Sequence, residues 1–247
     1  VSTSAWQSDP GKLVFTDDLR FPDMVYAKAL RANVAHGLVK KIDISKAEKM
    51  KGILRILTGK DIPGENVFGL IVPDQPVFCD HEVRFVGDTL ALVIGETEEL
   101  VEAALEEIEV EIDPLPVIHN MTEALKPDAP VLHPRLKDVY PGMPNVLKHF
   151  HISKGDIKKG FAEADLIYEQ SYKVPFVEHA YMETETSIGK LEEDGTVKIY
   201  VGSQGPTNDR SQVAKVLGVD EEKVQIAHMY MGGGFGGKED ISGQIHA

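Results

Sequence analysis

The pattern of apolar and polar positions is clearest between residues 89 and 112. Residues 89–94 are apolar and rich in β-branched side chains, which predicts a buried strand. Thr97 can then cap a helix whose first turn is acidic, a favourable arrangement at the positive end of the helix dipole. The apolar residues on one face of this helix are Leu100, Val101, Ala104, Leu105 and Ile108. Residues 110–112 return as a strand, so the pattern predicts a strand–helix–strand unit packed through one apolar face.

Shorter elements are predicted on both sides of this unit. Before it, we expect short strands within residues 12–30, strands at 39–44 and 53–58, and a short helix at 45–50 that is closed by Gly52. After it, we expect strands at 149–152, 167–174, 197–201 and 223–231, and a helix at 208–217 that ends at Gly218.

The segment between residues 114 and 150 has weak periodicity and many prolines. Because proline fixes φ and removes a backbone donor, such a segment is typical of an ordered connector or linker. We place the domain boundary in this segment. Strands and helices on both sides of it predict an α+β or α/β chain.

Composition narrows the possible partners and compartment. The net charge of −14 argues against nucleic-acid and anionic-membrane partners, and no apolar run is long enough to span a membrane. The single cysteine, Cys79, can form no disulfide within the chain, and a reducing cytoplasm is the simplest compartment. One cysteine cannot hold an iron–sulfur cluster, so any cluster must lie on another chain. We expect Cys79 to be a buried small apolar residue rather than a nucleophile, and His149 and His151 to be surface residues rather than ligands.

The sharpest local feature is the glycine loop, residues 232–239 (GGGFGGKE), with five glycines around Phe235. Such a loop lets the backbone approach something closely and would leave its amide N–H groups free for an anionic or oxo ligand. A dinucleotide fingerprint remains possible, but a phosphate loop does not, because Glu239 stands where a magnesium-binding hydroxyl is needed. The remaining alternatives are a turn packed under some other cofactor and a structural turn without a ligand.

Several motifs in order resemble the xanthine dehydrogenase and aldehyde oxidase family of molybdenum hydroxylases. Residues 232–239, 175–185 and 200–206 with 213–218 resemble segments around the family's cofactor site, and residues 32–44, 80–88 and 107–116 resemble its a/b hammerhead domain. The resemblance implies an α+β fold, with a hammerhead domain over residues 1–130 followed by the beginning of a molybdopterin-binding domain over residues 131–247. It also implies a molybdenum–molybdopterin cofactor, held without protein ligands to the metal, and iron–sulfur and FAD groups on partner chains or domains.

The resemblance also assigns roles to individual residues. Gln204 would contact an oxo group of the metal without ligating the metal itself, although the sequence alone equally permits a turn glutamine. Phe235 and Gly236, together with Gly234, would wall the cofactor and offer backbone N–H groups. Glu239 would orient the substrate, as in purine-hydroxylating members, and its alternative is a solvated carboxylate. The implied reaction is a water-derived hydroxylation of an electron-poor carbon, with electrons leaving through the iron–sulfur and flavin partners.

Two classes of function stay open at this point. The first is part of a hydroxylase that acts on xanthine, hypoxanthine or related N-heterocycles, with an aldehyde-oxidising member as its variant. The second is a non-catalytic assembly or interaction module. The resemblance places the family's general-base glutamate and most of its pocket downstream of residue 247. We therefore expect the chain to need those downstream residues, and to be inactive and unable to bind cofactor stably on its own.

Overall fold

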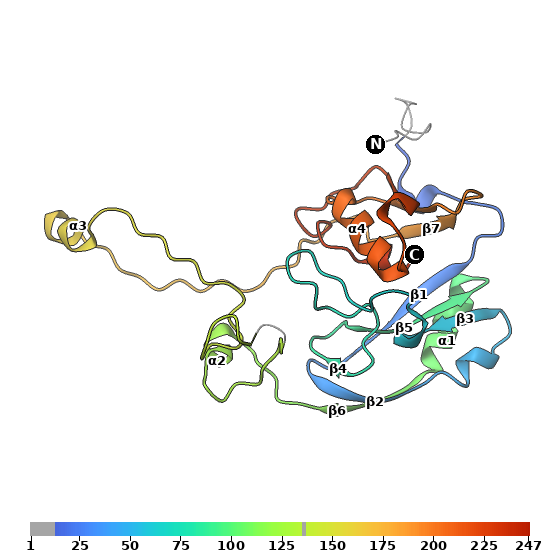
Figure 1. Cartoon of the computed structure of the whole chain (residues 1–247), viewed down its shortest axis with the longest axis horizontal. Coiled ribbons are helices and arrows are strands. Elements are labelled where there is room, and N and C mark those ends of the chain that lie inside the picture. Colours follow the sequence, from blue (N-terminus) through green and yellow to red (C-terminus); the bar gives the residue numbers. More distant parts are fainter. Residues whose placement is uncertain (1–12, 135–136) are drawn as a thin grey trace. The chain divides into compact units, whose positions relative to one another are not determined.

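The computed structural model describes residues 13–134 and 137–247, which form two compact units. The first unit combines Val1–Ile118 with His179–Ala247, and the second unit is His119–Glu178. Each unit is described by itself below, with element labels as in Figure 1.

The first sheet of the first unit is antiparallel, with strand order β1-β5-β3. Its strands are β1 (Tyr26–Arg31), β5 (Thr89–Gly95) and β3 (Ile53–Leu57). The central strand β5 is buried along almost its whole length, which explains why its sequence is a continuous apolar run rather than an alternating one. The predicted strands at 53–58 and 89–94 are therefore confirmed.

The second sheet has the order β4-β2-β6 and is also antiparallel. Its strands are β4 (Glu82–Val83), β2 (Gly37–Asp43) and β6 (Glu109–Pro114). Helix α1 (Glu98–Glu106) links β5 to β6, and the Thr97 hydroxyl caps it by accepting a hydrogen bond from Leu100 N. The predicted strand–helix–strand unit is confirmed, but its two strands lie in different sheets. Val101 and Ala104 of α1 share one buried cluster with Ala91 and Val93 of β5 and with Ile108.

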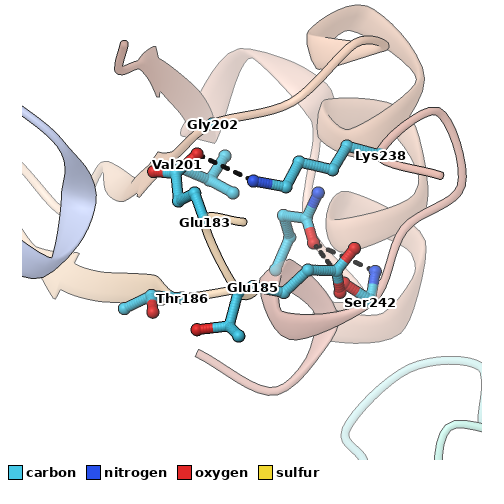
Figure 2. A pocket seen from close by; sticks show the side chains of 9 residues that line it. Glu183, Glu185, Thr186, Val201, Gly202, Lys238 and Ser242 are labelled. Atoms are coloured by element: carbon cyan, nitrogen blue, oxygen red, sulfur yellow. Dashed lines mark hydrogen bonds and ion pairs between the residues drawn. The ribbon is translucent and has the colours of Figure 1, made fainter. Parts of the chain in front are cut away.

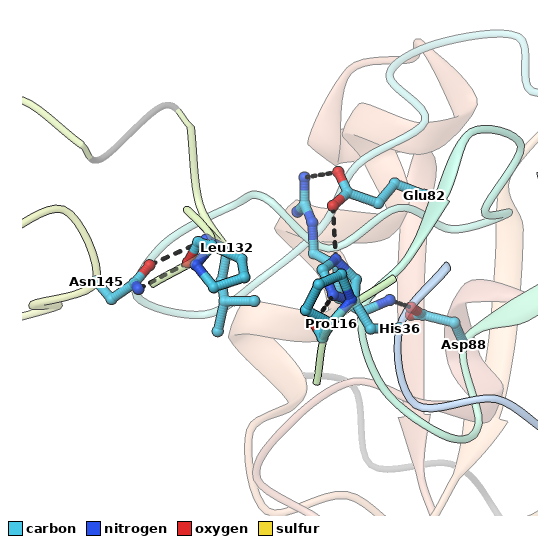
Figure 3. Close-up of polar contacts among 8 residues, drawn as sticks. His36, Glu82, Asp88, Pro116, Leu132 and Asn145 are labelled. Atoms are coloured by element: carbon cyan, nitrogen blue, oxygen red, sulfur yellow. Dashed lines mark hydrogen bonds and ion pairs between the residues drawn. The ribbon is translucent and has the colours of Figure 1, made fainter. Parts of the chain in front are cut away.

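A buried histidine joins three segments of this part of the chain. His36 Nε2 lies 2.9 Å from Glu82 Oε1, and His36 Nδ1 lies 2.6 Å from the carbonyl oxygen of Pro116 (Figure 3). Arg84 contacts the other Glu82 oxygen at 3.7 Å. These contacts hold the end of β6 beside β2 and β4, because Pro116 follows β6 closely.

The third sheet of the first unit has the order β7-β8-β9. Strand β7 (Ser187–Leu191) is antiparallel to β8 (Val197–Val201), and β8 is parallel to β9 (Val224–His228). Helix α4 (Pro206–Leu217) connects the two parallel strands and ends at Gly218, whose φ of 66° is the left-handed conformation expected there. Strand β7 was not predicted, and β9 is shorter than the predicted strand at 223–231.

Helix α4 packs against the loop that precedes β4, and this contact builds the largest apolar core of the first unit. The shared buried residues are Phe68, Val77, Phe78, Leu92, Val213, Ala214, Val216, Val224, Ile241 and Ile245. Two main-chain hydrogen bonds support the contact, from Gly64 N to Val216 O at 2.9 Å and from Glu65 N to Lys215 O at 3.1 Å. Single 3-10 turns complete the unit: η2 (Thr16–Asp18), η3 (Ala47–Lys49), η4 (Gly59–Asp61), η5 (Glu221–Lys223) and η6 (Gly243–Ile245).

The second unit contains two short helices, α2 (Met121–Ala124) and α3 (Ile157–Glu163). The Asn145 side chain ties one of its loops together, accepting from Leu132 N at 3.0 Å and donating to Pro130 O at 2.8 Å (Figure 3). The predicted strands at 149–152 and 167–174 are wrong for this structure, because neither segment pairs with another strand among the described residues. A strand needs a neighbour to accept its ladder hydrogen bonds, and sequence alternation alone does not supply one.

Candidate functional site

Two loops meet at the end of the parallel strand pair β8 and β9. The register pairs Val201 with His228, so residues 202–205 and the glycine loop, residues 232–239, both leave the sheet at its carboxyl edge. In sheets with parallel strands, ligands commonly bind in the crevice outside this edge. This topology brings together Gln204 and the glycine loop, which are separated in the sequence by helix α4 and strand β9.

Gln204 is bound to the glycine loop through both its main chain and its side chain. Its Oε1 atom accepts hydrogen bonds from Gly236 N at 3.0 Å and from Lys238 N at 3.2 Å. Its main-chain N donates to Lys238 O at 2.8 Å. Because both side-chain partners are N–H donors, the oxygen of the carboxamide must face the loop. The Nε2 group, with its two N–H donors, is therefore the part of the carboxamide that faces away from those partners.

The glycines are required by close packing against side chains of the same chain. A Cβ atom at Gly234 would lie 2.4 Å from Gln204 Oε1, and one at Gly237 would lie 2.7 Å from a ring carbon of Tyr181. Phe235 and Gly236 have positive φ values of 52° and 98°, so the loop turns through the left-handed region at two successive residues.

The prediction that the loop's amides are free is wrong for most of them. Gly232 N donates to Glu183 Oε2 at 2.6 Å, Gly237 N to Gly234 O at 2.7 Å, and Glu239 N to Gly236 O at 3.3 Å. Gly236 N and Lys238 N are bound to Gln204, as described above. Among the described residues, the amides of Gly233, Gly234 and Phe235 have no acceptor. Most amides of the loop therefore donate hydrogen bonds within the chain, and only the amides near the tip of the loop could donate to a ligand.

A buried ion pair lies behind the loop. Lys238 Nζ is 2.8 Å from Glu183 Oε2, and the lysine side chain is only 3% exposed (Figure 2). The ammonium group also lies 4.7 Å from the centre of the Tyr181 ring, a cation–π distance. This pair was not predicted from the sequence. A buried lysine needs a carboxylate partner, but nothing in the sequence of the glycine loop shows that Lys238 is buried.

The side chains of Phe235 and Glu239 lie on the open side of the loop. Phe235 is 76% exposed, and Glu239 is also exposed. Lys238 is engaged with Glu183, so it is not available to neutralise the neighbouring Glu239. The structure thus places an exposed carboxylate, an aromatic ring and the turn of Gln204 on two loops that contact each other.

A buried carboxylate supports the turn that carries Gln204. Asp209, in the first turn of α4, is fully buried, and its Oδ2 accepts from Gln244 Nε2 at 3.1 Å. Its Oδ1 has no partner with hydrogen-bond geometry among the described residues. Burial raises the pKa of Asp209, and contacts with Ser203 and Gln244 oppose this shift. The Ser203 hydroxyl in turn accepts from Gly205 N at 3.0 Å, which fixes the turn on both sides of Gln204.

Other residues considered in the sequence have structural roles or are exposed. Cys79 is buried, as predicted, and burial raises the pKa of its thiol to about 11, so it is a poor nucleophile at neutral pH. His149 and His151 are exposed, as predicted. Within residues 13–134 and 137–247, no group of three or more His, Cys, Asp and Glu side chains could hold a metal ion. In the same described ranges, no helix is long and apolar enough to cross a membrane.

Two family models match the chain. The model for the a/b hammerhead domain of aldehyde oxidase and xanthine dehydrogenase matches residues 10–116, and the model for the molybdopterin cofactor-binding domain matches residues 139–247. Together they account for most of the sequence, and the glycine loop and Gln204 both lie in the second match.

Curated proteins and solved structures with similar sequences agree with these matches. The chain is 42% identical over 96% of its length to a probable xanthine dehydrogenase subunit of Bacillus subtilis, of which it covers 31%. It is 35% identical over its whole length to the large molybdopterin subunit of a nicotinate dehydrogenase of Eubacterium barkeri, of which it covers 56%. It spans at most about half of these relatives. Among solved structures, the aldehyde oxidoreductase of Desulfovibrio desulfuricans matches 95% of the chain and 27% of its own length, with 30% identity and a TM-score of 0.85.

Proposed function

Because the chain belongs to the xanthine dehydrogenase and aldehyde oxidase family of molybdenum hydroxylases, as a portion of the molybdopterin-binding subunit, we propose that it supplies Gln204 and Glu239 to a hydroxylase of N-heterocycles. The proposed substrates are purines such as xanthine or hypoxanthine, and the proposed oxygen source is water. The fold is α+β, with the hammerhead domain followed by the beginning of the cofactor-binding domain. We propose the division between them as residues 1–130 and 131–247.

The observation that carries this proposal is the orientation of the Gln204 carboxamide. Its oxygen is bound to the amides of Gly236 and Lys238, so its N–H donors are directed away from the loop. Such donors match an oxo group, which is a hydrogen-bond acceptor, and the loop needs no metal-ligating side chain. The residues present therefore fit a molybdenum–molybdopterin cofactor that is held by hydrogen bonds rather than by protein ligands. When bound, that cofactor supplies the redox centre at which a carbon of the substrate is oxidised.

The chain's own contribution to that chemistry has three parts. Gln204 donates from Nε2, the exposed ring of Phe235 walls the site, and the amides of Gly234 and Phe235 add donors at the loop tip. Gly236 contributes by donating a hydrogen bond from its amide to Gln204 Oε1, which orients the carboxamide, and not as a direct donor to the cofactor. This differs from the direct contact that the sequence predicts for Gly236.

Glu239 is proposed to select the substrate. An exposed carboxylate can accept a hydrogen bond from a ring N–H and so orient a heterocycle. Purines and nicotinate-like rings offer such groups, whereas a simple aldehyde does not. An aldehyde-oxidising activity is the second candidate within the family, supported by the similarity to the Desulfovibrio enzyme. A non-catalytic assembly module is the alternative from another class.

The partners and the compartment are part of the same proposal. The electrons would pass to iron–sulfur and FAD groups on other chains or domains, because the one cysteine of this chain is buried and cannot hold a cluster. The remainder of the molybdopterin-binding domain would complete the pocket, and the chain alone would be inactive. The proposed location is the cytoplasm, and neither nucleic acid nor membrane is a proposed partner.

The test is a pair of substitutions in the assembled enzyme. Gln204→Glu keeps an oxygen for the two loop amides but replaces the outward N–H donors with an acceptor. We expect it to reduce hydroxylation of xanthine by about 100-fold to 1,000-fold, the loss that is typical when one preorganised donor is removed. Glu239→Gln should reduce hydroxylation of xanthine and leave aldehyde oxidation nearly unchanged.

Three results would contradict the proposal. Unchanged turnover and unchanged molybdenum content in Gln204→Glu would exclude the role of Gln204. Equal losses with xanthine and with an aldehyde in Glu239→Gln would exclude substrate selection by Glu239. Isotopically labelled water tests the oxygen source, and the absence of label in the product would overturn that part.

A further inference from the structure

Lys238 is the residue of the glycine loop that contacts both Gln204 and the carboxylate of Glu183. Its amide donates to Gln204 Oε1 at 3.2 Å and its carbonyl accepts from Gln204 N at 2.8 Å. Its Nζ atom donates to Glu183 Oε2 at 2.8 Å. The main chain of Lys238 therefore contacts Gln204, and its buried side chain contacts the partly buried Glu183, 55 residues earlier in the sequence.

Glu183 holds the glycine loop at two points. Its Oε2 atom accepts from the amide of Gly232, where the loop begins, and from the ammonium of Lys238, close to where the loop ends. Figure 2 shows the two side chains reaching toward each other from separate segments. A Cβ atom at Gly232 would lie 2.8 Å from Glu183 Cβ, so the contact is also tight sterically. One carboxylate oxygen thus fixes the distance between the two ends of the loop.

We propose that Glu183 and Lys238 are positioning residues that set the orientation of the Gln204 carboxamide. Their ion pair closes the glycine loop, and the closed loop presents the amides of Gly236 and Lys238 to Gln204 Oε1. With the oxygen held, Nε2 has a single outward direction. We call the ion pair of Glu183 and Lys238 the clamp. The contacts described above establish the clamp itself, whereas the proposal that Nε2 faces a cofactor rests on the proposed function.

An ion pair suits this task better than apolar packing does. A buried ammonium without an acceptor is costly, so Lys238 has few alternative positions once it is covered. The Tyr181 ring, 4.7 Å from Nζ, favours the same position of the charge. An apolar side chain of similar length would fill the space but would not select one position of the loop. Buried polar groups are known to specify one arrangement among several in some proteins.

The experiment measures hydrogen exchange of the glycine loop in the full chain without cofactor. The variants are Lys238→Met, which removes the ammonium, and Glu183→Gln, which keeps the shape and an acceptor oxygen but removes the charge. The matched control is Lys46→Met, because Lys46 also pairs with a glutamate, Glu109, but on the open surface. We expect the amides of Gly236 and Lys238 to exchange at least about tenfold faster in both test variants, while β8 and β9 stay protected.

A second measurement connects the clamp to Gln204 itself. The side-chain amide signals of Gln204, observed by nitrogen-15 NMR, should shift or broaden in Glu183→Gln and remain in place in Lys46→Met. Because Glu183→Gln is isosteric, it keeps the test valid if Lys238→Met does not fold.

The outcomes separate this inference from the proposed function. Exchange that rises uniformly through β8, β9 and the loop, with unchanged Gln204 signals, would show a merely structural pair and overturn the inference. If the clamp variants behave as expected but Gln204→Glu leaves turnover and molybdenum content unchanged, the proposed function fails and the clamp stands. If Gln204→Glu abolishes turnover but the clamp variants leave exchange and signals unchanged, only the inference fails.

Discussion

Two carboxylates support the candidate site, the partly buried Glu183 and the fully buried Asp209, and they are held in different ways. Glu183, on the side of the glycine loop, is paired with an ammonium group and a backbone amide. Asp209, on the side of helix α4, has only neutral hydrogen-bonding partners, and one of its oxygens has no partner with hydrogen-bond geometry among the described residues. The loop side therefore contains a direct ion pair, whereas on the helix side burial of Asp209 outweighs its favourable contacts, which include the charge of His228. The loop side should respond most to loss of a partner, and the helix side should respond most to pH.

The largest expected effect is on the loop side. Lys238→Met leaves the partly buried Glu183 without its cation, and breaking such a pair should cost about 3 kcal/mol of unfolding free energy, the lower end of the range for buried pairs. Unfolding by urea, monitored by circular dichroism, measures the loss. Lys46→Met, whose pair with Glu109 is fully exposed, should cost much less. Equal losses in the two variants would show that burial of the pair does not matter.

A smaller effect is expected where the two sides meet, at the contact between Gly234 and Gln204. Gly234→Ala places a methyl group 2.4 Å from Gln204 Oε1, so the loop or the carboxamide must shift. Forced overpacking of this kind usually costs about 1–3 kcal/mol. The same urea titration tests it, and Glu239→Gln, an exposed substitution at the far end of the same loop, is the control. A Gly234→Ala protein as stable as the control would mean that the contact is loose.

The smallest effect, on the helix side, depends on pH. Burial raises the pKa of Asp209 above its ordinary value of 3.8, so the folded state binds this proton more tightly than the unfolded state. Its contribution is present below pH 3.8 and is lost as the pH rises through the raised folded pKa. Asp209→Asn removes this dependence. The variant should therefore gain stability relative to the parent as the pH rises.

Urea titrations of the parent and of Asp209→Asn at several pH values measure this difference directly. Other groups that titrate over the same range cancel in the comparison, because both proteins contain them. A difference that does not change with pH would show that Asp209 has the same pKa in the folded and unfolded states. A difference that changes in the opposite direction would show that its contacts with Ser203 and Gln244 outweigh its burial.

Much of the first unit was predictable because its elements follow local rules. The run that forms β5, the Thr97 cap of α1 and the left-handed Gly218 after α4 are each determined by residues close in sequence. Strand β7 was missed, since its short sequence contains a glycine, a serine and a lysine. The segments at 149–152 and 167–174 show the converse, because alternation was present but the ladder partner was not. Pairing between strands is a long-range property that a local pattern does not contain.

The residues of the candidate site were predictable from the sequence, but the contacts among them were not. The sequence singled out Gln204, Phe235 and Glu239, and the structure brings the loops that carry them to one edge of a sheet. The sequence did not indicate that two amides of the loop donate to Gln204, or that Lys238 points inward to Glu183. Both facts depend on contacts between residues that are 32 to 55 positions apart. Whether these residues bind a cofactor or orient a substrate stays a prediction.

The contact between Glu183 and Lys238 also has a topological consequence. It joins two points that enclose β7, β8, α4 and β9, so this stretch of backbone forms a ring closed without a covalent bond. The turn at Gly195, between β7 and β8, lies inside that ring, and a Cβ atom added at Gly195 would have no neighbour within 4 Å. A protease that cut the chain at this turn would leave two pieces still fastened at the ion pair and along the strand ladders. Cleavage there should nick the protein without releasing either piece.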